Sequence, residues 1–286
     1  MARVLLTGLT GFIGSHLARS LVADGADVHA IVRPGARLER VADVAARVTV
    51  HEDDGTAATL EAIVERADPA IAYHLATNFL GAHTADDVGP LVIDNVAFPA
   101  RIAEALAGSS ALPFVNVGTA WQHVGGEPYR PKNLYAATKQ AFEDVLRHYG
   151  DRGLLHTVTL NLYDTYGPLD HRGKLLATLI ERLRTGEARG VCRGPTPKQH
   201  GPPARPGAGP RPSGAMFAAS RGARRSVRDV VDVLARVAGS PVPVEWGARP
   251  DREDEMLERW DAGPPVPGWQ PHVTLEQGLA ALLATS

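Results

Sequence analysis

The stretch "RVLLTGLTGFIGSHLARSLVADG" (Arg3–Gly25) decides the fold, because it joins an apolar strand pattern to an amphipathic helix pattern through a glycine-rich turn. Its glycines follow a G-x-x-G-x-x-G spacing at Gly8, Gly11 and Gly14. The first glycine permits a tight turn, the second lets a ligand approach the backbone, and the third lets the helix pack closely on the strand. The stretch therefore predicts the first strand–turn–helix unit of an α/β chain.

The same alternation continues along the first half of the chain. Apolar runs typical of strands lie at Arg3–Thr7, Val28–Val32, Arg47–His51, Ala70–Leu75, Pro113–Val117 and Thr157–Leu162. Helical patterns lie at Ile13–Ala23, Leu60–Arg66, Leu91–Ala107 and Asn133–Tyr149. This order predicts a Rossmann-type, doubly wound parallel sheet with helices on both faces. We expect residues 1–165 to form this domain and residues 166–286 to form mostly a smaller substrate-binding lobe.

Composition argues against several functional classes. A net charge of −2 over 286 residues gives no electrostatic case for binding nucleic acid or an anionic membrane. The lone cysteine, Cys192, excludes an internal disulfide, and no apolar run reaches the length of a membrane span. The eleven histidines lack ligand spacing, so we expect no metal. These features predict a cytoplasmic protein.

The glycine-rich turn also predicts a ligand. The N-terminus of the helix that follows offers free N–H groups and a partial positive charge, which suit a dinucleotide pyrophosphate. The residues that would form this site are Gly8, Thr10, Gly11, Phe12, Ile13 and Gly14. The alternative is a glycine-rich turn that binds nothing, but its place in the first strand–helix unit favours the dinucleotide.

The end of the second predicted strand bears on the choice of dinucleotide. An acidic residue there would accept hydrogen bonds from the adenosine ribose and repel a 2′-phosphate. The chain has Arg33 instead, whose planar guanidinium can pair with a phosphate. Arg33 favours NADPH over NADH, and the alternative is a solvated arginine at a strand end.

A tyrosine and a lysine lie one helical turn apart in "NLYAATKQAFEDVLRHYG" (Asn133–Gly150). Together with the glycine-rich turn, Tyr135 and Lys139 resemble the Tyr-x-x-x-Lys pair of the extended short-chain dehydrogenase/reductases. The resemblance implies that Tyr135 transfers a proton, that Lys139 lowers its pKa and holds the nicotinamide ribose, and that Thr119 holds the substrate oxygen. Each residue has a structural alternative: a half-buried aromatic, a surface cation and a turn residue.

The resemblance implies further site residues along the chain. Asp53 matches the acid that caps the adenine amine, with Asp54 as its neighbour, and Asn95 matches a helix asparagine of structural use that we also assign to the cofactor site. The remaining cofactor contacts would be Leu75, Ala76, Thr77 and Tyr163. The substrate contacts would be Thr77, Thr119, Gln122 and Asp164, the last in place of the phosphate-contacting asparagine of many relatives.

Within this family we expect the NADPH-dependent reduction of the C4 ketone of an NDP-4-keto-6-deoxyhexose. The chain resembles the 4-ketoreductases that complete deoxysugars, and a 4,6-dehydratase would need carboxylates where Ala120 and Trp121 stand. An NDP-sugar 4-epimerase and a catalytically idle dinucleotide-binding protein remain the alternatives. The expected partner is a nucleotide sugar, and the family allows a homodimer.

Residues 190–225 break the resemblance. The stretch Gly194–Gly214 holds seven prolines and five glycines and no large apolar residue, so it cannot bury apolar surface to offset its ordering entropy. Either a local frameshift produced it, or it is a flexible loop over the active site, and both predict a segment without regular structure. The resemblance resumes at Ser226, a predicted N-cap, and near the C-terminus Thr274 and Gln277 form a predicted capping box.

Overall fold

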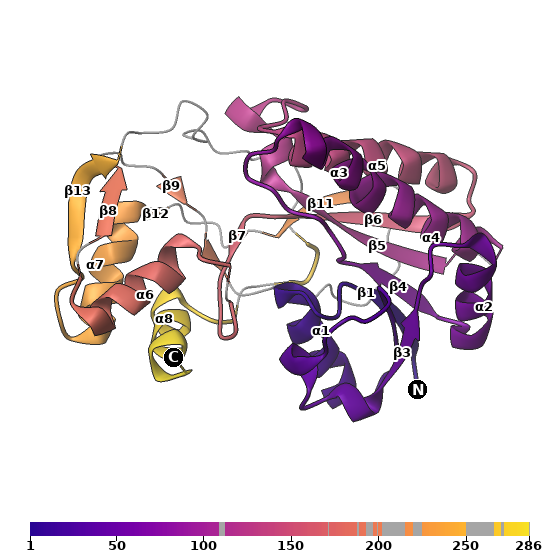
Figure 1. Cartoon of the computed structure of the whole chain (residues 1–286), viewed down its shortest axis with the longest axis horizontal. Coiled ribbons are helices and arrows are strands. Elements are labelled where there is room, and N and C mark those ends of the chain that lie inside the picture. Colours follow the sequence, from indigo (N-terminus) through magenta and orange to yellow (C-terminus); the bar gives the residue numbers. More distant parts are fainter. Residues whose placement is uncertain are drawn as a thin grey trace.

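The computed structural model describes residues 1–108, 112–170, 172–187, 189–192, 197–198, 200–201, 215–219, 225–249, 266–269 and 272–285. Its centre is a seven-stranded sheet in the order β11-β6-β5-β4-β1-β2-β3, in which every pairing is parallel (Figure 1). The strands are β1 (Arg3–Thr7), β2 (Asp27–Val32), β3 (Val48–Glu52), β4 (Ile71–His74), β5 (Leu112–Thr119), β6 (Leu155–Leu162) and β11 (Ala215–Ala219). The strand order reverses after β1, so the sequence-predicted Rossmann-type fold is confirmed.

Helices cover both faces of this sheet. One face carries α1 (Phe12–Ala23), followed after β2 by two short 3₁₀ turns, η1 (Glu39–Val41) and η2 (Ala45–Arg47). The other face carries α2, α4 and α5. The elements on that side are α2 (Ala57–Ala67), η3 (Ala85–Asp87), α3 (Val88–Val92), the π-helical turn η4 (Ile93–Ala97), α4 (Phe98–Ala107) and α5 (Leu134–Asp151).

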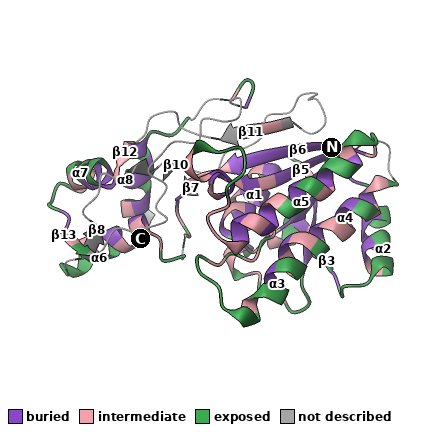
Figure 2. Ribbon diagram, turned by 90° about the horizontal axis from the view of Figure 1, so that it is seen from above, coloured by how far each residue is buried: buried purple, intermediate pink, exposed green. Residues whose placement is uncertain are grey.

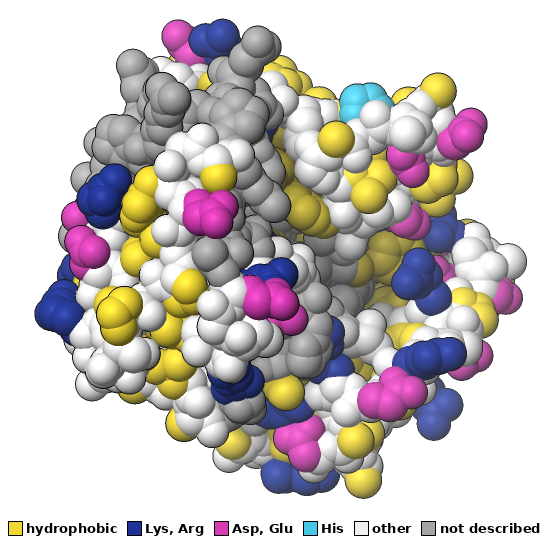
Figure 3. All heavy atoms as spheres, turned by 60° about the vertical axis from the view of Figure 1, so that its left-hand side comes forward, with side chains coloured by type: hydrophobic (Ala, Val, Ile, Leu, Met, Phe, Trp, Pro, Cys, Tyr) yellow, Lys and Arg dark blue, Asp and Glu magenta, His cyan; other side chains and the backbone are white. Residues whose placement is uncertain are grey.

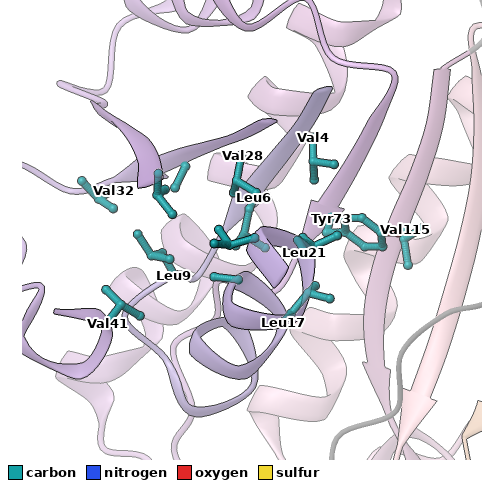
Figure 4. Packing of buried hydrophobic residues seen from close by; sticks show 14 of the residues in the cluster. Val4, Leu6, Leu9, Leu17, Leu21, Val28, Val32, Val41, Tyr73 and Val115 are labelled. Atoms are coloured by element: carbon teal, nitrogen blue, oxygen red, sulfur yellow. The ribbon is translucent and has the colours of Figure 1, made fainter. Parts of the chain in front are cut away.

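Two apolar clusters hold these layers together. In the first, Leu17 and Leu21 of α1 pack on Val4 and Leu6 of β1 and on Val28 of β2 (Figure 4). In the second, α2, α4 and α5 pack on the opposite face of the same strands. Buried and exposed stretches alternate along α4 and α5 (Figure 2), as expected for helices with one face on a sheet.

The C-terminal lobe has its own core, which lies beside the larger domain in Figure 1. It contains α6 (Leu175–Thr185), α7 (Val227–Ala238), α8 (Leu275–Thr285) and the parallel pair β8 (Arg189–Cys192) and β13 (Val244–Arg249). Both predicted caps are confirmed. The Ser226 hydroxyl accepts a hydrogen bond from Asp229 N at 3.1 Å. The Thr274 hydroxyl accepts one from Gln277 N at 3.1 Å, and the Gln277 side chain accepts one from Thr274 N at 2.8 Å.

The proline-rich stretch 194–214 lies mostly outside the described residues. Its four described residues form two short strands, β9 (Pro197–Lys198), paired with β12 (Arg225–Ser226), and β10 (His200–Gly201), paired with β7 (Asp164–Thr165). At these four residues the expectation of a segment without regular structure is wrong, because their backbones pair with neighbouring strands. Directly after it, β11 returns to the main sheet beside β6, and Val266 joins the core on the α1 face. The C-terminal part of the chain therefore contributes to both domains.

A search of the described residues for a helix long and apolar enough to cross a membrane found none.

Candidate active site

The glycine-rich turn lies at the carboxyl end of β1 and is shaped by close backbone contacts. Gly8 has a φ of +78°, and a Cβ on it would lie 2.7 Å from the Ala76 backbone nitrogen. A Cβ on Gly14 would lie 2.0 Å from the Gly8 carbonyl oxygen. Glycine is required at both positions because a side chain would push the turn away from β4 and α1 away from the turn.

The helix that follows the turn begins at an open N-terminus. Gly11 is its N-cap residue and supplies no side-chain cap. The ring of Phe12 is buried, with the Arg172 guanidinium 4.5 Å from its centroid, so only the backbone of Phe12 can face a ligand here. Free N–H groups at the start of a helix fit a pyrophosphate.

The ends of β1 and β4 are joined through one hydroxyl. Thr7 Oγ1 accepts hydrogen bonds from Leu75 N and Ala76 N, both at 3.1 Å, and forms a hydrogen bond with His74 Nδ1 at 2.9 Å. These contacts hold the backbone of Leu75 and Ala76 against the glycine-rich turn, which places the two segments expected to contact cofactor side by side.

Asn95 connects this edge of the sheet to the helix that carries Tyr135. Its Oδ1 accepts from Thr77 Oγ1 (3.0 Å) and Asn78 N (2.8 Å), and its Nδ2 donates to Asn78 O (2.9 Å) and Thr138 Oγ1 (3.0 Å). The side chain is 1% exposed and its hydrogen-bonding capacity is used by protein groups. Asn95 thus has the contacts of a structural residue, which differs from our expectation that it contacts cofactor.

The side chains expected at the adenosine end lie near the ends of β2 and β3. Arg33 is exposed and forms no ion pair with any described residue. Asp53 is buried, accepts from Gly55 N at 3.0 Å and lies 3.5 Å from Arg101 Nη2. Asp54 accepts from the Thr56 backbone and hydroxyl, and the first of these bonds is the main reason its pKa is lowered.

Tyr135 and Lys139 lie in the first two turns of α5, which Asn133 caps by accepting from Ala136 N at 3.0 Å. Both side chains are buried, at 8% and 2% exposure. Burial raises the pKa of Tyr135 to about 12, although a hydrogen bond with Thr77 and the charge of Arg172 lower it. Burial lowers the pKa of Lys139 to about 8, and the charge of Glu143 opposes this shift. In the chain without cofactor the pKa of Tyr135 is thus raised, in contrast to the lowered pKa that the resemblance implies, because desolvation outweighs the Thr77 hydrogen bond and the charge of Arg172.

Two aromatic side chains pack against Tyr135 and against each other. The rings of Phe79 and Trp121 meet it edge-on, with centroids 5.0 Å and 6.5 Å away. Phe79 is 48% exposed, and Lys132 lies 4.8 Å from the centroid of the Trp121 ring. The molecular surface is hollowed between the lobe and the larger domain, and hydrophobic side chains are visible in this hollow (Figure 3).

Thr119 ends β5, and Gln122 is in the 3₁₀ turn η5 (Ala120–Gln122) directly after it. Gln122 is 0% exposed, and its Oε1 accepts from Thr119 N at 2.9 Å. Its Nε2 donates to Gln140 Oε1 and Glu143 Oε1, both at 3.0 Å. The expectation that Gln122 contacts substrate is therefore corrected: its amide is occupied by protein groups and is turned into the core.

The sequence analysis missed Glu143. It lies four residues after Lys139 on the buried face of α5 and is 8% exposed. Burial raises its pKa, against the hydrogen bond from Gln122 and the charge of Lys139. The regular interval between Tyr135, Lys139 and Glu143 was the available signal, because residues four apart share a helix face.

The remaining expected substrate residue, Asp164, forms an ion pair. Lys174 Nζ, at the start of α6, lies 3.1 Å from Asp164 Oδ1. Tyr163, between β6 and β7, is partly exposed. A search of the described residues for three or more grouped histidine, cysteine or carboxylate side chains that could hold a metal found none.

Residues 4–205 match the sequence profile of the NAD dependent epimerase/dehydratase family. The chain belongs to this family. It is 27% identical over 187 residues to a CDP-abequose synthase from Yersinia pseudotuberculosis, a match that covers 65% of this chain and 63% of that protein. It is 28% identical over 306 residues to a UDP-glucose 4-epimerase from Mycolicibacterium smegmatis, covering 97% and 96%.

The fold of this epimerase/dehydratase family member also has a solved counterpart. The crystal structure of a UDP-glucose 4-epimerase with UDP-glucose from Thermotoga maritima superposes with a TM-score of 0.83, covering 99% of this chain and 97% of that one, at 19% identity. Family membership and fold are therefore established independently of the site geometry.

Proposed function

We propose that the protein is an NADPH-dependent reductase of the C4 ketone of an NDP-4-keto-6-deoxyhexose. The observation that carries this proposal is Tyr135, buried against Phe79 and Trp121 one helical turn from Lys139. With a pKa of about 12, Tyr135 is protonated at neutral pH, the form that can donate a proton to a carbonyl oxygen. In a 4-epimerase reaction the same group would act first as a base.

The cofactor site proposed here uses the glycine-rich turn. NADPH, when bound, supplies the hydride that reduces the sugar carbonyl. The open N-terminus of α1 would take the pyrophosphate, and Arg33 the 2′-phosphate. Asp53, Asp54, Leu75, Ala76, Thr77 and Tyr163 are the further proposed contacts.

In the proposed reaction, Tyr135 donates its phenolic proton to the C4 oxygen as the carbonyl π bond breaks. Thr119, at the end of β5, would hydrogen-bond the same oxygen as its negative charge develops, and Lys139 would hold the nicotinamide ribose. The aromatic side chains of Phe79 and Trp121 suit the methyl group of a 6-deoxy sugar. The absence of a carboxylate at Ala120 and Trp121 disfavours dehydration.

The direct test replaces the proposed acid. Tyr135→Phe should retain NADPH binding but lose at least about 10²-fold in turnover of a dTDP- or CDP-4-keto-6-deoxyhexose, the scale of a lost general acid. The matched control is Tyr149→Phe on the same helix. It removes a hydroxyl that donates a hydrogen bond to Glu104 at 2.8 Å, away from the proposed site, and should change turnover by no more than about threefold. Near-normal turnover by Tyr135→Phe would reject the assignment.

A UDP-sugar 4-epimerase is the second candidate, favoured by the match to the mycobacterial epimerase over 97% of this chain. The two are separated by assaying UDP-glucose and UDP-galactose interconversion without added reductant, against NADPH oxidation by the ketosugar. Binding of NADPH with neither activity would indicate a dinucleotide-binding protein without catalysis.

A further inference from the structure

The buried face of α5 carries three ionisable side chains at intervals of four residues: Tyr135, Lys139 and Glu143. The proposed mechanism uses the first two and gives no role to the third. A buried carboxylate is costly unless its hydrogen bonds and charge are used. Glu143, at 8% exposure, therefore requires a physical explanation.

Glu143 is connected through hydrogen bonds of Gln122 to the end of β5, the strand that carries Thr119. Gln122 Nε2 donates to Glu143 Oε1 at 3.0 Å, while Gln122 Oε1 accepts from Thr119 N at 2.9 Å. One glutamine side chain thus connects the carboxylate on α5 to the backbone of Thr119. Through it, the helix with Tyr135 and Lys139 and the strand end with Thr119 are held in register.

Packing around Gly118 limits the movement of the carboxylate. A Cβ on Gly118 would lie 2.8 Å from Glu143 Oε1 and 2.0 Å from Asn161 Oδ1 of β6. The carboxylate therefore lies directly against the backbone of β5, one residue before Thr119. It cannot shift toward the sheet without displacing that strand.

Glu143 also lies one helical turn from Lys139 on the same buried face of α5, where its negative charge opposes the burial that lowers the pKa of Lys139. His74 of β4, Asp144 and Arg147 of α5 are the other titratable groups whose charges act on this pair. Asp144 and Arg147 have side chains 58% and 66% exposed, so solvent screens them, whereas the buried Glu143 is not screened in this way. His74 is neutral, because burial lowers its pKa well below 6.5.

We propose that Glu143 is a positioning residue of this active site, which places a negative charge one helical turn from Lys139 and, through Gln122, holds Thr119 in place. The proposal rests on the proposed function for the roles of Lys139 and Thr119. It adds to that function two separate effects of the Glu143 side chain, an electrostatic effect on Lys139 and a mechanical effect on Thr119.

The test separates charge from hydrogen bonding. Glu143→Gln keeps the size and an oxygen that can accept from Gln122, but removes the negative charge. The pH at which NADPH binding weakens on the alkaline side should fall by about one unit, since Lys139 then loses its proton more easily. Gln122→Leu should leave that pH in place and lower kcat for the ketosugar at least about tenfold, with a smaller change in KM.

Two further variants complete the experiment. Asp144→Asn, a matched loss of one negative charge from the exposed side of α5, should leave the pH dependence in place. Glu143→Asp moves the charge away from Lys139 by one methylene, so the pH at which NADPH binding weakens on the alkaline side should fall by a smaller amount. This variant provides a test even where the glutamine variant does not fold. The proposal would be overturned if the pH at which NADPH binding weakens on the alkaline side stayed the same in the folded Glu143 variants, or if it changed in Asp144→Asn. NADPH titration needs no sugar, so wild type that binds NADPH without reducing the ketosugar would reject the proposed function and still test Glu143.

Discussion

At the scale of single residues, the site combines side chains that face a ligand with side chains that face only protein. We propose that Tyr135 and Arg33 belong to the first kind, whereas Asn95, Gln122 and Glu143 have their polar atoms within the fold. The difference decides what a substitution does. Loss of a ligand-facing group changes chemistry or affinity, and loss of an internal group changes geometry first.

Arg33 provides a residue-scale prediction about the cofactor. Arg33→Ala should weaken NADPH binding by about 1.5–3 kcal/mol, the scale of a hydrogen bond to a charged group, and leave NADH binding nearly unchanged. Fluorescence titration with both dinucleotides measures this, with Arg66→Ala, an exposed arginine of α2, as the control. Equal losses for the two cofactors would show that Arg33 does not discriminate between them.

At the scale of elements, the close contact between α1 and the glycine-rich turn fixes the position of the proposed pyrophosphate site. Gly14→Ala should lower the free energy of unfolding by about 1–3 kcal/mol and weaken NADPH binding, because its Cβ would lie 2.0 Å from the Gly8 carbonyl oxygen. Urea unfolding and cofactor titration measure the two effects.

Gly108→Ala is the matched control, since Gly108, at the C-terminal end of α4, has a φ of −74° and a Cβ there meets nothing within 4 Å. It should leave stability unchanged or raise it by up to about 1 kcal/mol. A Gly14→Ala protein as stable as Gly108→Ala would contradict the contact.

The α7 capping box provides a second element-scale prediction. Ser226→Ala removes a hydroxyl that accepts from Asp229 N at 3.1 Å, and should cost about 0.5–2 kcal/mol of stability. Thermal unfolding measures the loss, which Ser226→Asp should largely restore because aspartate also caps helices. Full stability of the alanine variant would show that the lobe does not depend on this cap.

Elements were predictable where the pattern is local. Five of the six strands from β1 to β6 are mostly buried and β3 is partly buried, and all six are rich in apolar or β-branched residues, so their sequences alone reveal them. Strand β11, with the sequence "AMFAA", follows a proline-rich stretch and is defined only by its pairing with β6. In the candidate site too, features that depend on contacts between distant parts of the chain could not be predicted. The four-residue spacing on one helix face reveals Tyr135 and Lys139, but the inward direction of Gln122 depends on contacts with α5 that no local pattern shows.

At the scale of the whole molecule, buried histidines make stability depend on pH. Burial is the main cause that lowers the pKa values of His51, His74 and His123 below 6.5. Below pH 6.5 the unfolded chain therefore binds protons that the native protein does not, and stability falls as the pH falls. Each such histidine contributes a slope of up to about 1.4 kcal/mol per pH unit.

The expected result is a lower urea midpoint at pH 5.5 than at pH 7.5. His51→Gln should reduce this difference, because it removes one of the groups that the unfolded chain protonates. Equal midpoints at the two pH values would contradict the buried, neutral state of these histidines.

The position of β11 has a consequence for how the protein is made. The nascent chain completes β6 at residue 162, but the strand that covers its edge ends only at residue 219. While the ribosome synthesises the residues between, the apolar β6 presents unpaired N–H and C=O groups, a template for pairing with other chains. A fragment cut at residue 165 should therefore be recovered mostly as aggregate, and one extended through residue 219 should be more soluble. Synthesis of this protein thus includes an interval of exposure to aggregation, which ends when the seventh strand of the sheet is in place.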